Sequence, residues 1–228
     1  MDLRLRPFQK NVVGLARVLA KENFAARAEK HDREASFPFD DYDDLREAGL
    51  LRLCVPESHG GLGANFETYC LVAEQIAQGN ASTALTFNMH STTMLIAGPI
   101  ADNLSMSKEL RICHEKNRAA LFEEVVEQGV FYGQPHSEPI ELGETDKALQ
   151  VGGRRFGTVA DKVDGGYRVN GRKFFVSLSG AANYFSTPAL LSGDSPWLER
   201  TLYLKVPVDA EGLSFVGDWD PMGMRATV

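Results

Sequence analysis

One change of pattern, near residue 129, constrains the fold of this chain more than any other feature of its sequence. Before it, apolar residues recur every three or four positions, as they do on the buried face of a helix. After it, short apolar runs alternate with glycines and acidic turns, which is the pattern of strands joined by tight turns. The sequence therefore predicts an α+β chain, with an N-terminal helical bundle domain over residues 1–129 and an antiparallel β-barrel or sandwich domain over residues 130–228.

Five helices with short joints are expected in the first half, and several short strands in the second. The helices are predicted over residues 8–19, 40–51, 66–76, 82–97, where Ser82 is the expected cap, and from Ser105 or Ser107 to about residue 126. The strands are predicted over residues 131–132, 156–163, 167–169, 173–178, 184–191, 201–206 and 213–216.

Composition narrows the classes of protein that this chain can belong to. Of 228 residues, 43% are hydrophobic and 24% are charged, so the chain is expected to bury a core rather than stay disordered. The net charge of −7 argues against a nucleic-acid or anionic-membrane partner. We see neither a signal peptide nor an apolar run of about 18 residues. The cysteines, Cys54, Cys70 and Cys113, form no C-x-x-C pair, which favours a reduced, cytoplasmic protein.

Most motifs that suggest chemistry have a simpler structural interpretation. Gly60–Gly63 lacks the strand, spacing and lysine of a phosphate-binding loop, so a structural loop is favoured. The five histidines lack the spacing of a helical metal pair, and no metal site is predicted. The acidic stretch Asp40–Asp44 is typical of a solvated helix start. His90 interrupts an apolar helix, which fits a core edge and a helix lining a ligand cavity about equally.

The segment "DGGYRVNGRKFFVSLSG", residues 164–180, carries the strongest candidate for a binding site. Its turn signals and aromatic run predict a pair of strands. On a strand, Phe175 and Ser177 would point to one face, where a ring and a hydroxyl could hold the edge of a planar heterocycle. The loop from Tyr132 to Pro139 could lie alongside. Ordinary packing of an amphipathic sheet face is the alternative, since most aromatic residues of strands belong to the core.

Several segments together resemble the acyl-CoA dehydrogenase family. They are "REAGLLRLCVPESHGGLG", "LVAEQIAQGNAST", "SEP" at residues 137–139, residues 164–180, and "LYLKVPVDAEGLSFVGDWDPMGMRATV". They cover most of the chain, in order and at plausible spacing. The resemblance implies an N-terminal α domain, a middle β domain and, beyond residue 228, a C-terminal helical domain, with FAD at their junction.

The resemblance also implies roles for individual residues. Tyr132, His136 and Ser137 would meet the flavin, while Phe175, Val176 and Ser177 would pack along its isoalloxazine ring. Ser177 would donate toward the N5–O4 edge of that ring, which stabilises the charge of the reduced flavin. The residues implied to bind substrate are Phe87, His90, Met94 and Thr145. The family's catalytic glutamate belongs to the C-terminal domain, so the resemblance assigns no catalytic residue to this chain.

The activity implied by the resemblance is α,β-dehydrogenation of an acyl-CoA thioester, with hydride transfer to flavin N5. An electron-transfer flavoprotein would accept the electrons, and the protein would be a homo-oligomer, either a dimer or a tetramer. This sequence departs from the family after Pro139, where residues 140–146 replace a Gly-x-Gly-Ser-Asp turn that contacts substrate. That departure keeps open a reduced-flavin monooxygenase of the same superfamily, acting on an aromatic or amine substrate. A truncated, non-catalytic binding module is a further alternative.

Overall fold

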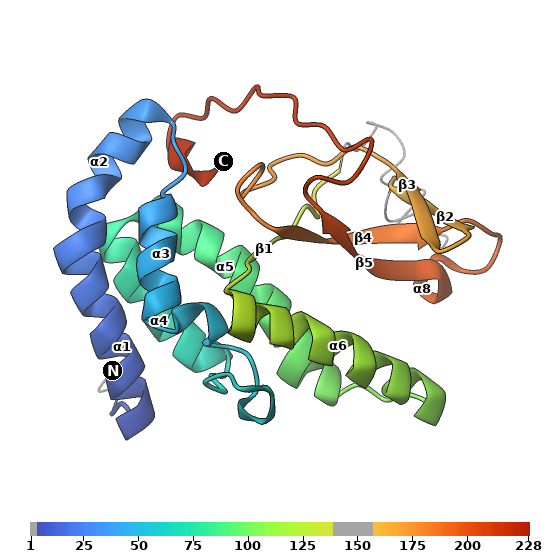
Figure 1. Cartoon of the computed structure of the whole chain (residues 1–228), viewed down its shortest axis with the longest axis horizontal. Coiled ribbons are helices and arrows are strands. Elements are labelled where there is room, and N and C mark those ends of the chain that lie inside the picture. Colours follow the sequence, from blue (N-terminus) through green and yellow to red (C-terminus); the bar gives the residue numbers. More distant parts are fainter. Residues whose placement is uncertain (1–3, 139–156) are drawn as a thin grey trace.

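The computed structural model describes residues 4–138 and 157–228, and in these ranges a helical half is followed by a sheet (Figure 1). The main helices are α1 (Pro7–Leu19), α2 (Ala25–Glu34), α3 (Phe39–Glu47), α4 (Phe66–Gly79), α5 (Ala81–Leu95) and α6 (Lys108–Gln128). The strands are β1 (Tyr132–Gly133), β2 (Val159–Val163), β3 (Gly166–Asn170), β4 (Tyr184–Leu191) and β5 (Thr201–Pro207), with the short helix α8 (Trp197–Arg200) between the last two. The predicted α+β class is therefore confirmed.

Short polar side chains cap three of these helices at the N-terminus. Asn65 accepts a hydrogen bond from the backbone of Thr68 at the start of α4, and Ser107 does the same for Leu110 at the start of α6. Asn80, rather than the predicted Ser82, caps α5. Its side chain accepts from the backbone N–H groups of the second and third helical residues, so the helix begins earlier than predicted.

The helix predicted to end at Leu19 continues, through a change in its winding, to Glu34. A π-helical segment, Ala20–Phe24, joins α1 to α2. An extra residue in a helical turn rotates every following side chain around the axis, so one apolar spacing pattern cannot describe both halves. The joint lies against α4, where a Cβ on Gly79 would be 2.8 Å from the Cα of Ala20. The end of α4 thus needs a residue without a side chain.

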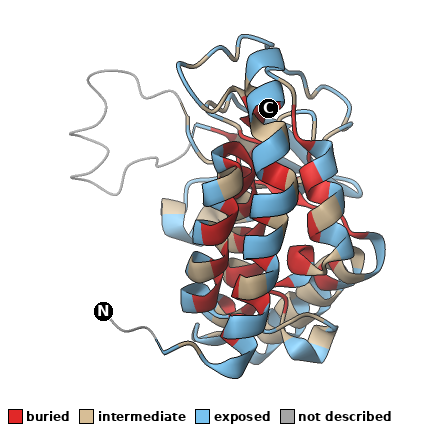
Figure 2. Cartoon of the chain, turned by 90° about the vertical axis from the view of Figure 1, so that its left-hand side faces the viewer, coloured by how far each residue is buried: buried red, intermediate tan, exposed pale blue. Residues whose placement is uncertain are grey.

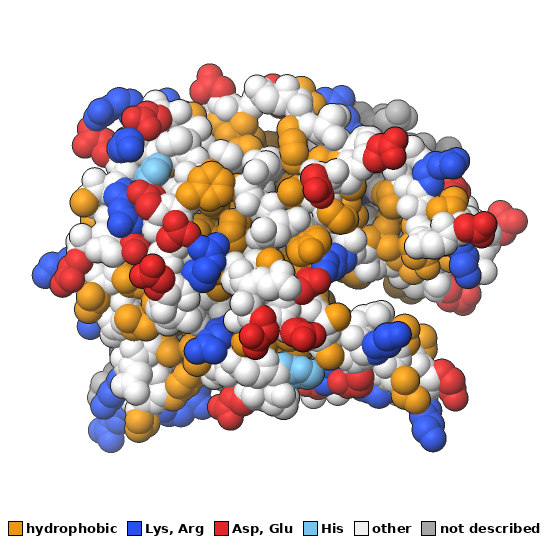
Figure 3. Space-filling view, viewed as in Figure 1, with side chains coloured by type: hydrophobic (Ala, Val, Ile, Leu, Met, Phe, Trp, Pro, Cys, Tyr) orange, Lys and Arg blue, Asp and Glu red, His pale blue; other side chains and the backbone are white. Residues whose placement is uncertain are grey.

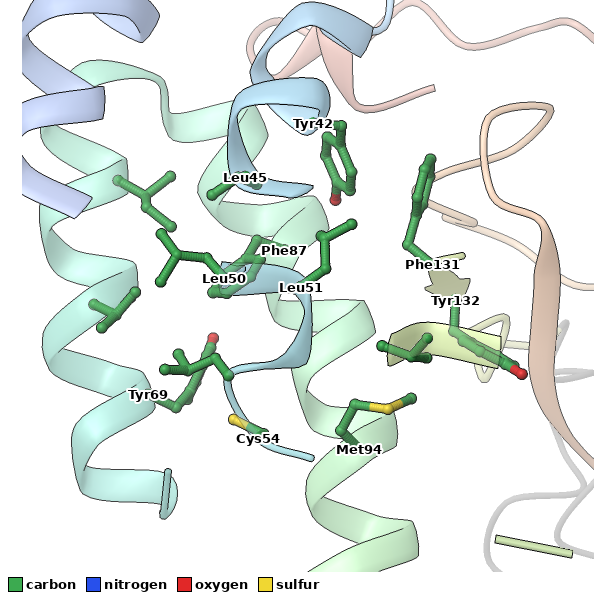
Figure 4. Packing of buried hydrophobic residues seen from close by; sticks show 14 of the residues in the cluster. Tyr42, Leu45, Leu50, Leu51, Cys54, Tyr69, Phe87, Met94, Phe131 and Tyr132 are labelled. Atoms are coloured by element: carbon green, nitrogen blue, oxygen red, sulfur yellow. The ribbon is translucent and has the colours of Figure 1, made fainter. Parts of the chain in front are cut away.

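The core lies mainly among the helices, where buried residues line the inner faces (Figure 2). Tyr42 and Phe131 meet with ring centroids 4.4 Å apart, which joins the helical half to the segment entering the sheet (Figure 4). Leu45, Leu50 and Phe87 fill the space behind them and are fully buried. Each fully buried side chain of this size contributes roughly 1.5–3 kcal/mol of hydrophobic stabilisation. One continuous core therefore extends from the helices to the first strand.

The sheet is mixed and open, which corrects the prediction of an antiparallel barrel or sandwich. Its central strand β4 pairs antiparallel with β5 from Tyr184 to Leu190. It also pairs parallel with β1 at Tyr184 and Phe185, and parallel with β2 at Leu190 and Leu191. Among the described strands, β2 and β3 form a further antiparallel pair. Parallel partners need long connections, and those leading to β4 are long, so turn signals alone could not reveal this pairing.

Two further predictions for this half are wrong. Residues 173–178 form turns around a single bridge at Phe174 instead of a strand, and residues 213–216 form no strand either. The chain then returns from the sheet to the helices, and the short helix η5, Arg225–Thr227, packs beside α2 and α5 (Figure 1). The face of the molecule seen in Figure 1 is hollowed between α6 and the β4–β5 edge, and acidic and basic side chains are interspersed on it (Figure 3). Among the described helices, none has the length and apolar character of a membrane span.

Candidate functional site

Two segments that are distant in sequence, residues 132–138 and residues 172–177, meet outside the regular strands of the sheet. The backbone N–H of Phe174 donates to the carbonyl of Ser137 at 2.9 Å. Just before it, Gly171 lies so close to the start of β2 that an added Cβ would be 2.8 Å from the Cα of Thr158. This close approach needs glycine, and it directs residues 172–175 toward the 132–138 segment. The structure thus brings Ser137 together with the Phe175–Ser177 turn.

Phe175 has an unusual conformation and an unusual exposure. Its φ is +51°, in the left-handed region, and 77% of its surface is exposed. A bulky residue with positive φ is a genuine outlier, and such residues cluster at functional sites. Its ring meets that of Trp219 edge-on, with centroids 6.4 Å apart. The neighbouring Phe174 ring also meets it edge-on, at 6.5 Å, and the turn still presents a largely exposed aromatic ring.

Ser177 lies in the same turn but is buried, with 8% of its surface exposed. Its backbone N–H donates to the carbonyl of Phe175 at 3.1 Å, and the next residue, Leu178, donates to Thr227 at 2.7 Å. Leu178 also has a positive φ, of +72°. The shared strand face predicted for Phe175 and Ser177 does not exist, and a tight turn brings the two together instead. Val176, between them, is half-buried.

The residues around this turn fit a planar ring with polar edges. The indole Nε1 of Trp219 is buried and has no hydrogen-bond partner among the described residues. Buried N–H groups are nearly always paired, so such a group beside an exposed ring marks a place where a ligand acceptor can bind. Together with the Phe175 ring and the Ser177 hydroxyl, it gives a stacking surface and donors at its rim. A flavin has this combination of a flat ring and polar edge atoms.

His136 points away from this turn, toward the sheet. Its ring packs edge-on against Tyr203 of β5 at 5.9 Å and donates a hydrogen bond to the backbone carbonyl of Ser186. Burial lowers the pKa of His136, against the effect of that hydrogen bond. Its Nε2 is buried without a partner among the described residues. The contact of His136 with flavin stays a prediction.

Tyr132 lies at the joint between α6 and the sheet. Its buried ring stacks on Tyr184 at 5.5 Å, and its hydroxyl donates to Glu124 at 3.1 Å. Lys205 of β5 donates to the same carboxylate, with its Nζ 2.6 Å from one oxygen and 3.9 Å from the centroid of the Tyr184 ring. Burial and the nearby carboxylate raise the pKa of Tyr132. These contacts hold α6 against the sheet. The flavin contact of Tyr132 also stays a prediction.

The residues predicted to bind substrate on α5 are all fully buried. Phe87 and Met94 belong to the helical core. The Nε2 of His90 donates to the carbonyl of Leu51 at 2.6 Å, and its Nδ1 accepts from the backbone N–H of Tyr132 at 3.3 Å. Burial lowers the pKa of His90 to about 4, against the effect of the Leu51 bond, so the ring is neutral. His90 therefore braces the helices against β1. Thr145 lies outside the described residues.

One buried pair at this site escaped the sequence reasoning. Glu138, next to Ser137, and Lys173, next to Phe174, form an ion pair with 8% and 12% of their side chains exposed. The two are 35 residues apart, and neither lies in a pattern that predicts a buried charge. The only signal was their position, since each adjoins one of the segments assigned to the site.

The structure supports one of the simpler interpretations and corrects another. In the Gly60–Gly63 loop, a Cβ on Gly61 would collide with the Val55 carbonyl, so the loop is a tight structural turn. No cluster of metal-binding side chains exists among the residues that the structure describes. The acidic stretch does begin a helix, α3, but Asp41 within it is fully buried rather than solvated.

Comparisons with known proteins agree with this architecture. Residues 7–105 match the model of the acyl-CoA dehydrogenase N-terminal domain. A Bacillus subtilis protein named "Putative acyl-CoA dehydrogenase YdbM" is 31% identical over 209 residues, which are 90% of this chain and 49% of that protein. A dibenzothiophene monooxygenase of Rhodococcus erythropolis is 27% identical over 215 residues, covering 94% of this chain and 46% of that protein.

Solved structures give the same picture. The crystal structure of FMN-bound TdsC from Paenibacillus sp. A11-2 is 25% identical, with a TM-score of 0.75, and the match covers 95% of this chain and 49% of that one. The methanesulfinate monooxygenase of Pseudomonas fluorescens is 26% identical, with a TM-score of 0.69, covering 98% and 48%. The chain thus spans about half the length of the relatives that it matches.

Proposed function

This chain belongs to the acyl-CoA dehydrogenase family, and from that premise we propose that it binds a flavin and uses it to oxidise an organic substrate. One observation carries the proposal. Phe175, exposed and held at positive φ, lies beside a buried serine and beside an indole N–H that has no partner among the described residues. A strained backbone around an unsatisfied donor is typical of a site completed by a ligand.

Each residue of the turn has a defined role in this proposal. The Phe175 ring provides the surface on which the flavin ring lies, and the Ser177 hydroxyl donates to its polar edge. Ser137, held to Phe174 by the backbone hydrogen bond, borders the same place. A bound flavin supplies two-electron redox chemistry, while the protein orients it and tunes its electronics. We propose FAD as the cofactor, as in the dehydrogenases, although the TdsC structure holds FMN.

For the reaction, we propose α,β-dehydrogenation of an acyl-CoA thioester. The match of residues 7–105 and the 31% identity to YdbM support this reaction. We assign no general base to residues 1–228 and propose that a carboxylate outside them removes the α-proton. An electron-transfer flavoprotein as electron acceptor and a homo-oligomeric state belong to the same proposal.

Monooxygenation by reduced flavin is the second candidate. The segment after Pro139 lacks the Gly-x-Gly-Ser-Asp turn of the dehydrogenases, and several relatives are named as monooxygenases. Such an enzyme would receive its flavin already reduced and would need oxygen.

One set of measurements on the full-length protein separates these candidates. Flavin released by heating identifies FAD or FMN, and anaerobic addition of acyl-CoA shows whether substrate reduces it. Bleaching by acyl-CoA supports the dehydrogenase. Reduction by an external reductase alone supports the monooxygenase. Absence of flavin contradicts both and favours a non-catalytic module.

The assignment of the flavin site itself needs matched variants. Phe175→Ala should weaken flavin binding, because it removes the stacking surface. Phe66→Ala removes a similarly exposed ring, 65% exposed, at the start of α4 and should leave flavin binding unchanged. Equal flavin affinity in the two variants would place the flavin elsewhere.

A further inference from the structure

Glu138 is the centre of a dense set of hydrogen bonds beside the candidate site. Its carboxylate accepts from the side chain of Lys173 and from the backbone N–H of Gly157, at the start of the 157–163 segment. It also accepts from the hydroxyl of Thr158 at 2.6 Å and from the backbone N–H of Thr158 at 3.2 Å. Burial alone would raise the pKa of Glu138, but these donors lower it, so the carboxylate is charged.

Lys173 connects the same carboxylate to the central strand. Its Nζ donates to the carbonyl of Pro188 in β4 at 3.0 Å while it pairs with Glu138. Burial lowers the pKa of Lys173, and the partner carboxylate opposes that effect. A buried charge is tolerated only when it is paired and hydrogen-bonded, so neither side chain is suited to this position without the other.

The position of the pair relates it to the candidate flavin site. Glu138 follows Ser137, Lys173 precedes Phe174, and the backbone hydrogen bond from Phe174 to Ser137 lies between them. The ion pair therefore fastens the two segments at the point where they meet. Phe175, two residues beyond Lys173, begins the turn that has positive φ values.

We propose that Glu138 and Lys173 are positioning residues that fix the spacing between Ser137 and the Phe175–Ser177 turn, and thereby set the affinity for flavin. This inference rests on the proposed function. Neither side chain needs to touch the flavin. The pair acts through the backbone, because the segments that it joins carry the residues proposed to make contact. Buried polar networks of this kind rigidify their surroundings when every member is satisfied.

Flavin titration of the full-length protein tests the proposal. Lys173→Met should weaken flavin binding about tenfold, the effect of losing one hydrogen bond to a charged group. Lys173→Arg keeps the cation and should restore most of the affinity. Arg118→Met removes a cation equally buried, 11% exposed, that pairs with Asp102 and Glu115 in the helical half, and it should have no effect. Unchanged flavin affinity in Lys173→Met would overturn the inference.

A second readout needs no flavin. The emission of Trp219, taken as the difference between each protein and its Trp219→Phe counterpart, reports on the turn, because Phe175 packs against that indole. Lys173→Met should shift this emission, and Arg118→Met should not. A shifted emission in a protein that binds no flavin would support the positioning role and contradict the proposed function. An unshifted emission would overturn the positioning role.

A milder variant tests the same proposal if Lys173→Met does not fold. Thr158→Val removes only the hydroxyl donor to Glu138 and keeps both charges. It should weaken flavin binding severalfold and shift the Trp219 emission in the same direction. A folded Thr158→Val protein that matches wild type in both measurements would contradict the proposal.

Discussion

The helical half and the sheet half of this molecule differ in how many large side chains they bury and in how regular their backbone is. Among the described residues, nine of the twelve largest fully buried side chains come from before residue 130. The sheet half contributes few, and β3 is exposed along its whole length. The exceptional backbone of the candidate site, at Phe175 and Leu178, belongs to the sheet half. We infer that the helices supply most of the stability, while the irregular turns of the second half carry function.

The largest effect is expected from Asp41→Leu in the helical half. The buried Asp41 carboxylate accepts from Arg27 at 3.2 Å, from Asn80 at 3.0 Å and from Thr83 at 2.7 Å. Removing it takes away the acceptor of the buried Asn80 and Thr83 donors, while Arg27 keeps its pairs with Asp40 and Asp44, and it should lower the free energy of unfolding by about 4 kcal/mol. Denaturant unfolding measures the loss.

The control for this variant lies on the same helix. Asp43→Leu removes an exposed carboxylate, paired with Arg46, and should change the free energy of unfolding by less than about 0.5 kcal/mol. If the two variants were equally stable, the helical half would not carry the stability assigned to it.

The next effect concerns pH and His90. Its pKa is about 4 in the folded protein, against 6.5 for an ordinary histidine, because burial disfavours the charged ring. The unfolded chain therefore takes up a proton as the pH falls below about 6.5, and the folded protein does not until about pH 4. This histidine should reduce stability progressively across that window, by about 3 kcal/mol in total.

Unfolding measured between pH 7 and pH 4 in wild type and His90→Leu checks this effect. The variant should be less stable at pH 7, where the bonds to Leu51 and Tyr132 are lost, and should depend less steeply on pH. Parallel pH profiles would show that His90 does not titrate as described.

A smaller effect is expected at the joint between the two halves. Lys205→Met removes the ion pair with Glu124 and the cation–π contact with Tyr184. Both groups are partly exposed, so the loss of unfolding free energy should be about 1 kcal/mol. Proteolysis at the α6–β5 joint should accelerate slightly, while flavin affinity stays at the wild-type value. A loss as large as that of Asp41→Leu would mean that the joint is part of the stabilising core.

The smallest effect on stability, and a clear effect on function, is expected from Ser177→Ala. The unfolding free energy should change by less than about 0.5 kcal/mol. Loss of one hydrogen bond to the reduced flavin, about 1 kcal/mol, should shift the two-electron potential by about 20 mV. Spectroelectrochemistry of the loaded protein measures the shift. An unchanged potential at full flavin occupancy would remove Ser177 from the site.

Sequence periodicity predicted the helices well because most of them bury one regular face. It did not predict that the helix continues after Leu19, because the π-helical turn at Ala20–Phe24 rotates the buried face around the axis. In the sheet, β4 was predicted with its observed bounds, but its parallel partners depend on contacts between distant segments. Local pattern carries no information about such pairing.

The backbone conformation at the candidate site differs from the predicted one. The aromatic run at Lys173–Ser177 has strand propensity, and tertiary contacts override it. Gly171 against Thr158 bends the chain before the run, and the bond from Leu178 to Thr227 bends it afterwards. The Glu138–Lys173 pair had no signal beyond its position beside the segments assigned to the site, since each partner is uninformative until the other is beside it.

The contacts of residues 225–227 have a consequence for the order in which this protein folds. Arg225 pairs with Asp32, 193 residues earlier, and the Thr227 carbonyl accepts from the Leu178 N–H inside the candidate site. During synthesis, the helices can collapse around their core long before these residues leave the ribosome. The turn at Phe175 has to wait for them, because pairings across such long separations form slowly. The segment proposed to bind the flavin thus becomes ordered only after the helical core that supports it.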